Sequence, residues 1–203
     1  MIEGIVPGTR ARLAVLRAVL ENEGTTITGL IQRTGVSPNT VVAYVDRLVT
    51  AGVLREDRIG GVQKTHIRQL YVRTDSEFAR SVIALVELDR RLALSETYPH
   101  LRPIMDHLVD VLGERARFVL VYGSHARLAA TSESDLDLLV VGGPGIERTR
   151  GLADVFVTLE AEHSLRTMSL EEFREKSRTP FLRSILRDHV IIAGTDAFLR
   201  ALL

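Results

Sequence analysis

The chain has 203 residues, of which 45% are hydrophobic and 26% are charged, a globular composition that excludes disorder as the main state. No apolar run approaches the ~18 to 20 residues of a membrane span, and no basic start followed by an apolar stretch indicates a secretory signal. We therefore expect a cytoplasmic protein that does not bind membranes. The lack of cysteine excludes disulfides, thiol nucleophiles and thiolate metal sites.

The net charge is zero, with 26 basic and 26 acidic residues, but the charges are unevenly spread. Residues 1–74 contain ten Lys or Arg against six Asp or Glu, which leaves this segment at +4 and the remainder at −4. A basic segment followed by an acidic one favours a polyanion-binding unit joined to a unit with a different task.

Three short helices are predicted within the first fifty residues. Thr9 is a suitable N-cap for the first helix, and the second spans about 27–34. Ser37 followed by Pro38 is a start signal for the third helix, whose predicted buried side chains are Val42, Val45, Leu48 and Val49. Its outer face is then predicted to carry Asn39, Thr40, Ala43, Tyr44 and Arg47.

Two extended runs around Gly60 and Gly61 follow the third helix and predict a β-hairpin. With the segment 34–54, this pattern resembles the winged helix-turn-helix of bacterial and archaeal transcription regulators. The resemblance implies a helix in the major groove of double-stranded DNA and a wing on the backbone or minor groove. It implies DNA contacts from Asn39, Thr40, Tyr44 and Arg47 in the helix and from Arg58, Lys64 and Arg68 in the wing. The alternative is a module for protein interaction or dimerisation only.

Residues 75–115 are predicted to form two linking helices with apolar faces, separated near Pro99. Either these faces pack against their own chain, or one of them buries a homodimer interface. Winged-helix regulators commonly use a dimer to read two half-sites. Both interpretations are kept.

The apolar run 118–122 predicts a buried strand that leads directly into Gly123 and Ser124 at a helix start. Gly123 lets a ligand approach the backbone. The free N–H groups that follow it and the Ser124 hydroxyl can donate hydrogen bonds to phosphate oxygens. The next strand carries Asp135 and Asp137, which point to one face because side chains alternate along a strand. Two such carboxylates predict a divalent cation shared with substrate phosphates.

This combination resembles the polymerase-β-like nucleotidyltransferase superfamily, and its minimal members in particular, over about residues 116–195. The resemblance implies that Gly123, Ser124 and Arg127 hold a nucleoside triphosphate. It also implies that Asp135 and Asp137 bind Mg²⁺ or Mn²⁺ and are the catalytic carboxylates.

The sequence departs from that family where active members have a third carboxylate, because Arg166 occupies the position. A cation cannot bind a second metal ion or accept a proton from the attacking hydroxyl, which puts catalysis in doubt. Glu160 and Glu162 lie just upstream and would substitute in a shifted register.

We therefore expect an α/β (α+β) protein with a winged helix-turn-helix at 1–74, linking helices at 75–115 and a nucleotidyltransferase-like mixed sheet with flanking helices at 116–203. One hypothesis is a DNA-binding transcription regulator whose last domain binds nucleotide and metal, with or without slow nucleotidyl transfer. The alternative is a metal-dependent nucleotidyltransferase, toxin-like or small-molecule-modifying, that uses the winged helix for autoregulation or substrate recruitment. Arg166 favours the first hypothesis, and the intact aspartates support the second.

Overall fold

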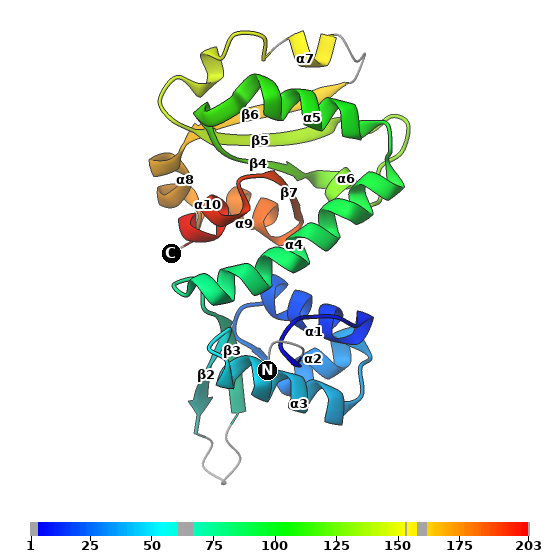
Figure 1. Ribbon diagram of the computed structural model, residues 1–203, viewed down its shortest axis with the longest axis vertical. Helices are drawn as coiled ribbons and strands as arrows, with labels where there is room; N and C mark the ends of the chain where they lie inside the picture. Colours follow the sequence, from blue (N-terminus) through cyan, green and yellow to red (C-terminus); the bar gives the residue numbers. More distant parts are fainter. Residues whose placement is uncertain (1–3, 61–66, 153, 158–161, 203) are drawn as a thin grey trace. The chain divides into compact units, whose positions relative to one another are not determined.

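The computed structural model describes residues 4–60, 67–152, 154–157 and 162–202. It confirms a mixed fold of helices and two sheets, which divides into two compact units, residues 1–86 and 87–203. The division falls inside one long helix, α4 (Glu77–Thr97) (Figure 1). No helix in the described ranges is both long and apolar enough to cross a membrane.

The first unit is built from three helices and a small sheet. The helices are α1 (Arg10–Glu21), α2 (Ile27–Thr34) and α3 (Pro38–Thr50). The two predicted start signals, Thr9 and Ser37, are confirmed as caps, because their side chains accept the backbone N–H groups of Arg12 and Thr40. The side chain of Thr26, which was not predicted as a cap, accepts the N–H of Gly29 at the start of α2. Gly35 ends α2 in the left-handed conformation, which lets the chain turn sharply into α3.

The predicted hairpin is confirmed as the antiparallel pair β2 (Leu54–Ile59) and β3 (Ile67–Val72). A two-residue strand, β1 (Thr25–Thr26), joins the other edge of β3, so the sheet order is β1-β3-β2. The core of this unit packs the inward faces of α1, α2 and α3 against Leu54 and Leu70 of the sheet. Ala79, Val82 and Val86 from the first half of α4 complete it.

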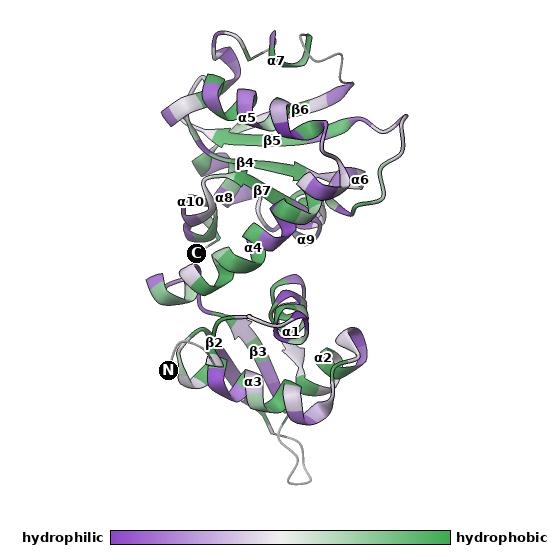
Figure 2. Ribbon diagram, turned by 45° about the vertical axis from the view of Figure 1, so that its right-hand side comes forward, coloured by the Kyte–Doolittle hydropathy of each residue, from purple (hydrophilic) through white to green (hydrophobic). Residues whose placement is uncertain are grey.

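The second unit is a four-stranded mixed sheet covered on both faces. Its strands are β4 (Ala116–Tyr122), β5 (Leu136–Gly142), β6 (His163–Ser169) and β7 (His189–Ala193), in the order β6-β5-β4-β7. β5 pairs with β6 in parallel, and the other two pairings are antiparallel. The two central strands, β4 and β5, are hydrophobic along most of their length (Figure 2).

The flanking helices divide between the two faces of this sheet. One face packs on α5 (Leu101–Leu112) and the short α7 (Asp154–Val157), with Leu136 and Leu138 buried beneath them as predicted. The other face packs on α8 (Leu170–Lys176), α9 (Pro180–Arg187) and α10 (Thr195–Ala201). There Phe118 meets Phe173 and Phe198 edge-on, with ring centroids 5.0 and 5.3 Å apart. Short helical turns lie at Gly113–Arg115 and Ile146–Arg148, and α6 spans Gly123–Ala126.

Candidate functional sites

The exposed side of α3 forms a shallow hollow in the first unit. Asn39, Thr40 and Arg47 are exposed there, as predicted. With Arg12, Ala43 and Tyr44 they line a depression of about 300 Å³. Side chains of this kind can donate to phosphates and base edges, so the hollow is suited to polyanion binding.

Tyr44 was predicted on the outer face of α3, and this prediction is wrong. Its side chain is 2% exposed, and its hydroxyl donates to the carbonyl of Ile5 at 2.9 Å. Burial raises the pKa of Tyr44 to about 12. The buried stripe of α3 consists of Val41, Tyr44, Val45 and Leu48, and Val42, which was predicted to be buried, is 38% exposed.

Arg12 is a residue of this hollow that sequence reasoning missed. It lies in the first turn of α1, with its guanidinium carbon 5.7 Å from the centre of the Tyr44 ring. The Arg12 guanidinium therefore lies over the face of the buried Tyr44 ring, and in the hollow a cation occupies the place predicted for the Tyr44 side chain. No local pattern in the sequence indicates this neighbourhood, because α1 and α3 meet only in the folded unit.

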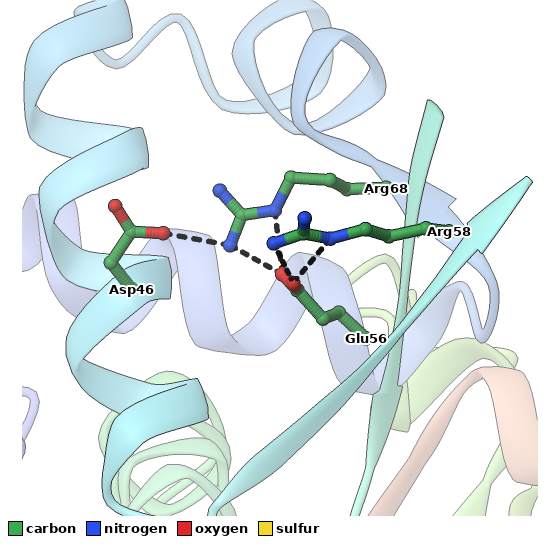
Figure 3. A network of polar contacts seen from close by, with 4 residues as sticks. All are labelled: Asp46, Glu56, Arg58 and Arg68. Atoms are coloured by element: carbon green, nitrogen blue, oxygen red, sulfur yellow. Dashed lines mark hydrogen bonds and ion pairs between the residues drawn. The ribbon is translucent and has the colours of Figure 1, made fainter. Parts of the chain in front are cut away.

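The predicted wing arginines take part in a network of ion pairs (Figure 3). Arg68 of β3 binds Glu56 of β2 at 2.6 Å and Asp46 of α3 at 2.7 Å. Arg58 binds the same Glu56 at 2.9 Å. These hydrogen bonds hold the pKa of Glu56 below its ordinary value, Arg58 contributing most. Arg68 therefore connects the hairpin to α3.

The two arginines differ in how available they are to a ligand. The Arg58 side chain is 65% exposed, whereas that of Arg68 is 25% exposed and bridges two carboxylates. Arg58 thus remains suited to a phosphate contact, and Arg68 is better described as a brace. Lys64, the third predicted wing contact, lies outside the described residues.

Comparison with protein families agrees with this geometry, because residues 9–55 match the family model described as winged helix-turn-helix DNA-binding. This part of the chain is a winged helix-turn-helix DNA-binding domain. Comparisons with curated proteins and with solved structures give no significant match. The winged helix-turn-helix domain explains why the basic excess is in the first third of the chain.

In the second unit, Gly123 and Asp137 lie in direct contact. Tyr122 and Asp137 are paired across β4 and β5, so the turn after β4 is close to the start of β5. Gly123 has a φ of +72°, and a Cβ at this position would collide with the Asp137 carboxylate. Only glycine therefore allows this approach, and Ser124 follows as the second residue of α6.

Asp135 and Asp137 form the predicted carboxylate pair, with Asp135 exposed and Asp137 half-buried. Burial and the charge of Asp135 together raise the pKa of Asp137 above its ordinary value. His125, Arg166 and Arg127 oppose this shift through their charges. Asp135 and the two arginines thus act electrostatically on Asp137, and Arg127 is exposed at the end of α6.

The position next to Asp137 on β6 is not acidic. Asp137 pairs with Ser164 in the parallel register, and Leu139 pairs with Arg166. Glu162 is exposed just before β6, and its carbonyl accepts the N–H of Leu136. Glu160 lies outside the described residues.

A second residue that the sequence did not assign is His125. It is 5% exposed, and its Nδ1–H donates to the carbonyl of Asp135 at 3.1 Å. Burial lowers the pKa of His125, and its ring packs edge-on against Tyr98 with centroids 5.0 Å apart. The imidazole therefore fixes the backbone that presents the carboxylates, beside a pocket of about 560 Å³ on the α5 face.

The carboxylates of Asp135 and Asp137 offer oxygen donors that a metal ion could share. No cluster of three or more His, Asp or Glu suited to a metal ion occurs in the described part of the chain. Two carboxylates fit a hard cation that completes its shell with water and phosphate oxygens, which is how Mg²⁺ is usually bound. The donors present therefore fit a magnesium ion brought in with a nucleotide better than a resident metal.

Proposed function

We propose that the chain is a DNA-binding transcription regulator whose second unit binds a nucleoside triphosphate together with a divalent cation. The DNA half of the proposal is carried by the winged helix-turn-helix domain and the exposed face of α3. The nucleotide half is carried by the contact between Gly123 and the Asp137 carboxylate. In this arrangement Asp135 and Asp137 would hold Mg²⁺ or Mn²⁺, and the backbone at Gly123 and Ser124 with Arg127 would receive the phosphates.

The DNA half is tested by fluorescence anisotropy on labelled duplexes over a range of salt concentrations. Arg47→Ala is expected to weaken binding by roughly 1 to 3 kcal/mol and to flatten the salt dependence. Arg148→Ala is the matched control, because Arg148 is 86% exposed on a turn of the second unit. Equal losses in both variants, or affinity that does not fall with salt, would contradict the proposal.

The nucleotide half is tested by equilibrium dialysis of each labelled nucleoside triphosphate with Mg²⁺ or with a chelator. Binding is expected to require both the cation and Asp137, so Asp137→Asn should abolish it. Retention of label by that variant, or in the presence of chelator, would contradict the assignment.

Nucleotidyl transfer is the second candidate function, favoured by the presence of both aspartates. In that reaction an acceptor hydroxyl attacks the α-phosphorus, and pyrophosphate leaves. The divalent cation would polarise the phosphate and neutralise the leaving group. Ser164 and Arg166 offer no carboxylate to receive the hydroxyl proton, and for this reason binding without transfer is the function that we favour.

We also propose that the regulator acts as a homodimer through the second unit. Leu88 and Leu92 of α4 are 41% and 53% exposed, and Leu92 borders a groove of about 600 Å³ between α4 and α5. The groove is lined by apolar Met105 and Val109 and by charges of both signs, Arg91, Arg102, Asp106 and Asp110. A surface with apolar side chains and charges of both signs can pair with a second copy of itself, as a two-fold interface requires. In sedimentation velocity the wild-type chain should be a dimer and Leu92→Asp should be a monomer. A monomeric wild-type chain, or a variant that is still a dimer, would contradict the proposal.

A further inference from the structure

Arg166 lies on the same face of the sheet as Asp137. Paired residues of neighbouring strands share a face, and so do alternate residues along a strand. Because Asp137 pairs with Ser164, the side chains of Asp137, Ser164 and Arg166 emerge together. The position where the resemblance places an acid is therefore occupied by a cation that faces the carboxylate site.

The Arg166 side chain is held in place by an aromatic ring. Its guanidinium carbon is 4.9 Å from the centre of Phe181, in the first turn of α9. The ring is 42% exposed, and Arg166 is exposed as well. A guanidinium stacked on a ring keeps its edge donors available, since the ring contacts only its face. Among the residues with described placement, no carboxylate forms an ion pair with Arg166, so those donors are open to a ligand.

The charge of the site follows from these positions. Two carboxylates, Asp135 and Asp137, are matched by two guanidinium groups, Arg127 and Arg166, which both act on Asp137. A third carboxylate in place of Arg166 would have given the site an excess negative charge, which a second metal ion would offset. With Arg166, one divalent cation gives the site a net positive charge, and a polyphosphate complements that charge.

We propose that Arg166 binds the phosphate oxygens of the nucleotide in place of a second metal ion, with Phe181 as the residue that positions the guanidinium. This inference rests on the proposed nucleotide site and deepens it. The ligand class is a nucleoside di- or triphosphate with one divalent cation, since a planar guanidinium is suited to bidentate phosphate recognition. The site then retains its nucleotide for two reasons. Arg166 stabilises the bound phosphates, and it occupies the position of the carboxylate that would activate an acceptor hydroxyl.

The test is isothermal titration calorimetry of the full chain with a nucleoside triphosphate and the corresponding monophosphate, both with Mg²⁺. Arg166→Gln is expected to weaken triphosphate binding about tenfold or more, the loss typical of a hydrogen bond between two charged groups. The affinity for the monophosphate should change less than threefold, because a monophosphate lacks the outer phosphates that Arg166 is proposed to bind. A structural role of Arg166 would weaken both ligands alike. Arg148→Gln, at the opposite end of β5, is the control.

Phe181→Leu tests the positioning role. If the ring acts through Arg166, this substitution weakens triphosphate binding in the wild-type background and has no further effect in the Arg166→Gln background. Additive losses would instead indicate that the ring contacts the nucleotide independently, which overturns the positioning role of Phe181. Arg166→Lys should recover only part of the affinity, because lysine keeps the charge and loses the planar donors.

The outcomes separate this inference from the function on which it rests. Loss of binding in Asp137→Asn with unchanged binding in Arg166→Gln would overturn the inference and leave the nucleotide site standing. Absence of Mg²⁺-dependent nucleotide binding in the wild-type chain would overturn both. Circular dichroism melting of each variant shows whether it has folded, and Arg166→Lys replaces Arg166→Gln if the latter has not.

Discussion

Arg68 of β3 donates to Asp46 of α3 at 2.7 Å, and this ion pair connects the hairpin to the helix that carries Arg47. Both elements that a winged domain applies to DNA are thereby held in one arrangement. The pair lies between side chains that are 25% and 53% exposed, so its contribution to stability is that of a surface interaction.

A double-mutant cycle on this pair should therefore give a small but measurable coupling. Asp46→Asn and Arg68→Gln are each expected to lower the free energy of unfolding by about 1 kcal/mol or less, and the double variant by less than their sum. Urea denaturation measures all four proteins, and the coupling should shrink at high salt. Strict additivity at low salt would show that the pair does not form in solution.

Tyr44→Phe tests the burial of Tyr44. Removing the hydroxyl leaves the Ile5 carbonyl without this buried donor, so the free energy of unfolding should fall by about 1 to 3 kcal/mol. DNA affinity should stay within about twofold of wild type, because the hydroxyl points into the core. Tyr71→Phe is the control, since the Tyr71 hydroxyl donates to the side chain of Gln69 in a part-buried setting. A loss of DNA affinity in Tyr44→Phe without a loss of stability would show instead that the Tyr44 hydroxyl contacts DNA.

Much of the first unit could be predicted from the sequence. The exception is which face of α3 is buried. The N-caps Thr9 and Ser37 and the hairpin follow from local chemistry, so their positions were predicted correctly. Val41 and Val42 are adjacent, and either one fits an apolar stripe with Val45 and Leu48. The choice between them is made by tertiary packing, which buries Val41 and Tyr44 in the core and brings the Tyr44 hydroxyl to the carbonyl of Ile5, 39 residues away.

The proximity of Gly123 to Asp137 could also be predicted from the sequence. Gly123, Ser124, Asp135 and Asp137 are close in sequence and lie on two paired strands and their connection, so local spacing brings them together. Phe181 could not be inferred, because its contact with Arg166 arises where α9 packs under the sheet. Arg12 was missed for the same reason in the first unit.

Gly123→Ala is expected to disrupt both stability and the carboxylate site. The substitution forces alanine into a left-handed conformation, at about 1 to 2 kcal/mol, and adds the collision with Asp137. Gly145→Ala is the matched control, with a φ of +79° and nothing within 4 Å of the added Cβ. Thermal melting should show the larger loss for Gly123→Ala, and only this variant should lose nucleotide binding. Equal effects would mean that the close approach to Asp137 is absent.

The lowered pKa of the buried His189 should make the stability of the second unit depend on pH. Burial, together with the positive charge of Arg90, lowers the pKa of His189 to about 3, despite the Glu87 carboxylate 3.6 Å from its Nε2. Below a pH of about 6.5 the unfolded chain takes up a proton on this residue and the folded chain does not, so stability falls as the pH falls.

His189→Gln should therefore remove part of the decline in stability between about pH 6.5 and pH 5, before most carboxylates titrate. Urea midpoints of both proteins measure the difference. Nuclear magnetic resonance of the ring should show His189 still neutral at pH 5. A ring that titrates near pH 6.5 in the folded protein would contradict this account.

The most direct test of the whole account is incubation of the chain with α-labelled nucleoside triphosphates and Mg²⁺ or Mn²⁺, together with bulk RNA and cell extract. The Asp135→Ala/Asp137→Ala double variant is the blank. We predict label that stays on the native protein, disappears on denaturation and is absent from the blank, as expected for a regulator that binds a nucleotide without transferring it. Covalent label on the protein, RNA or an extract component that depends on the two aspartates would instead show that the chain is a nucleotidyltransferase.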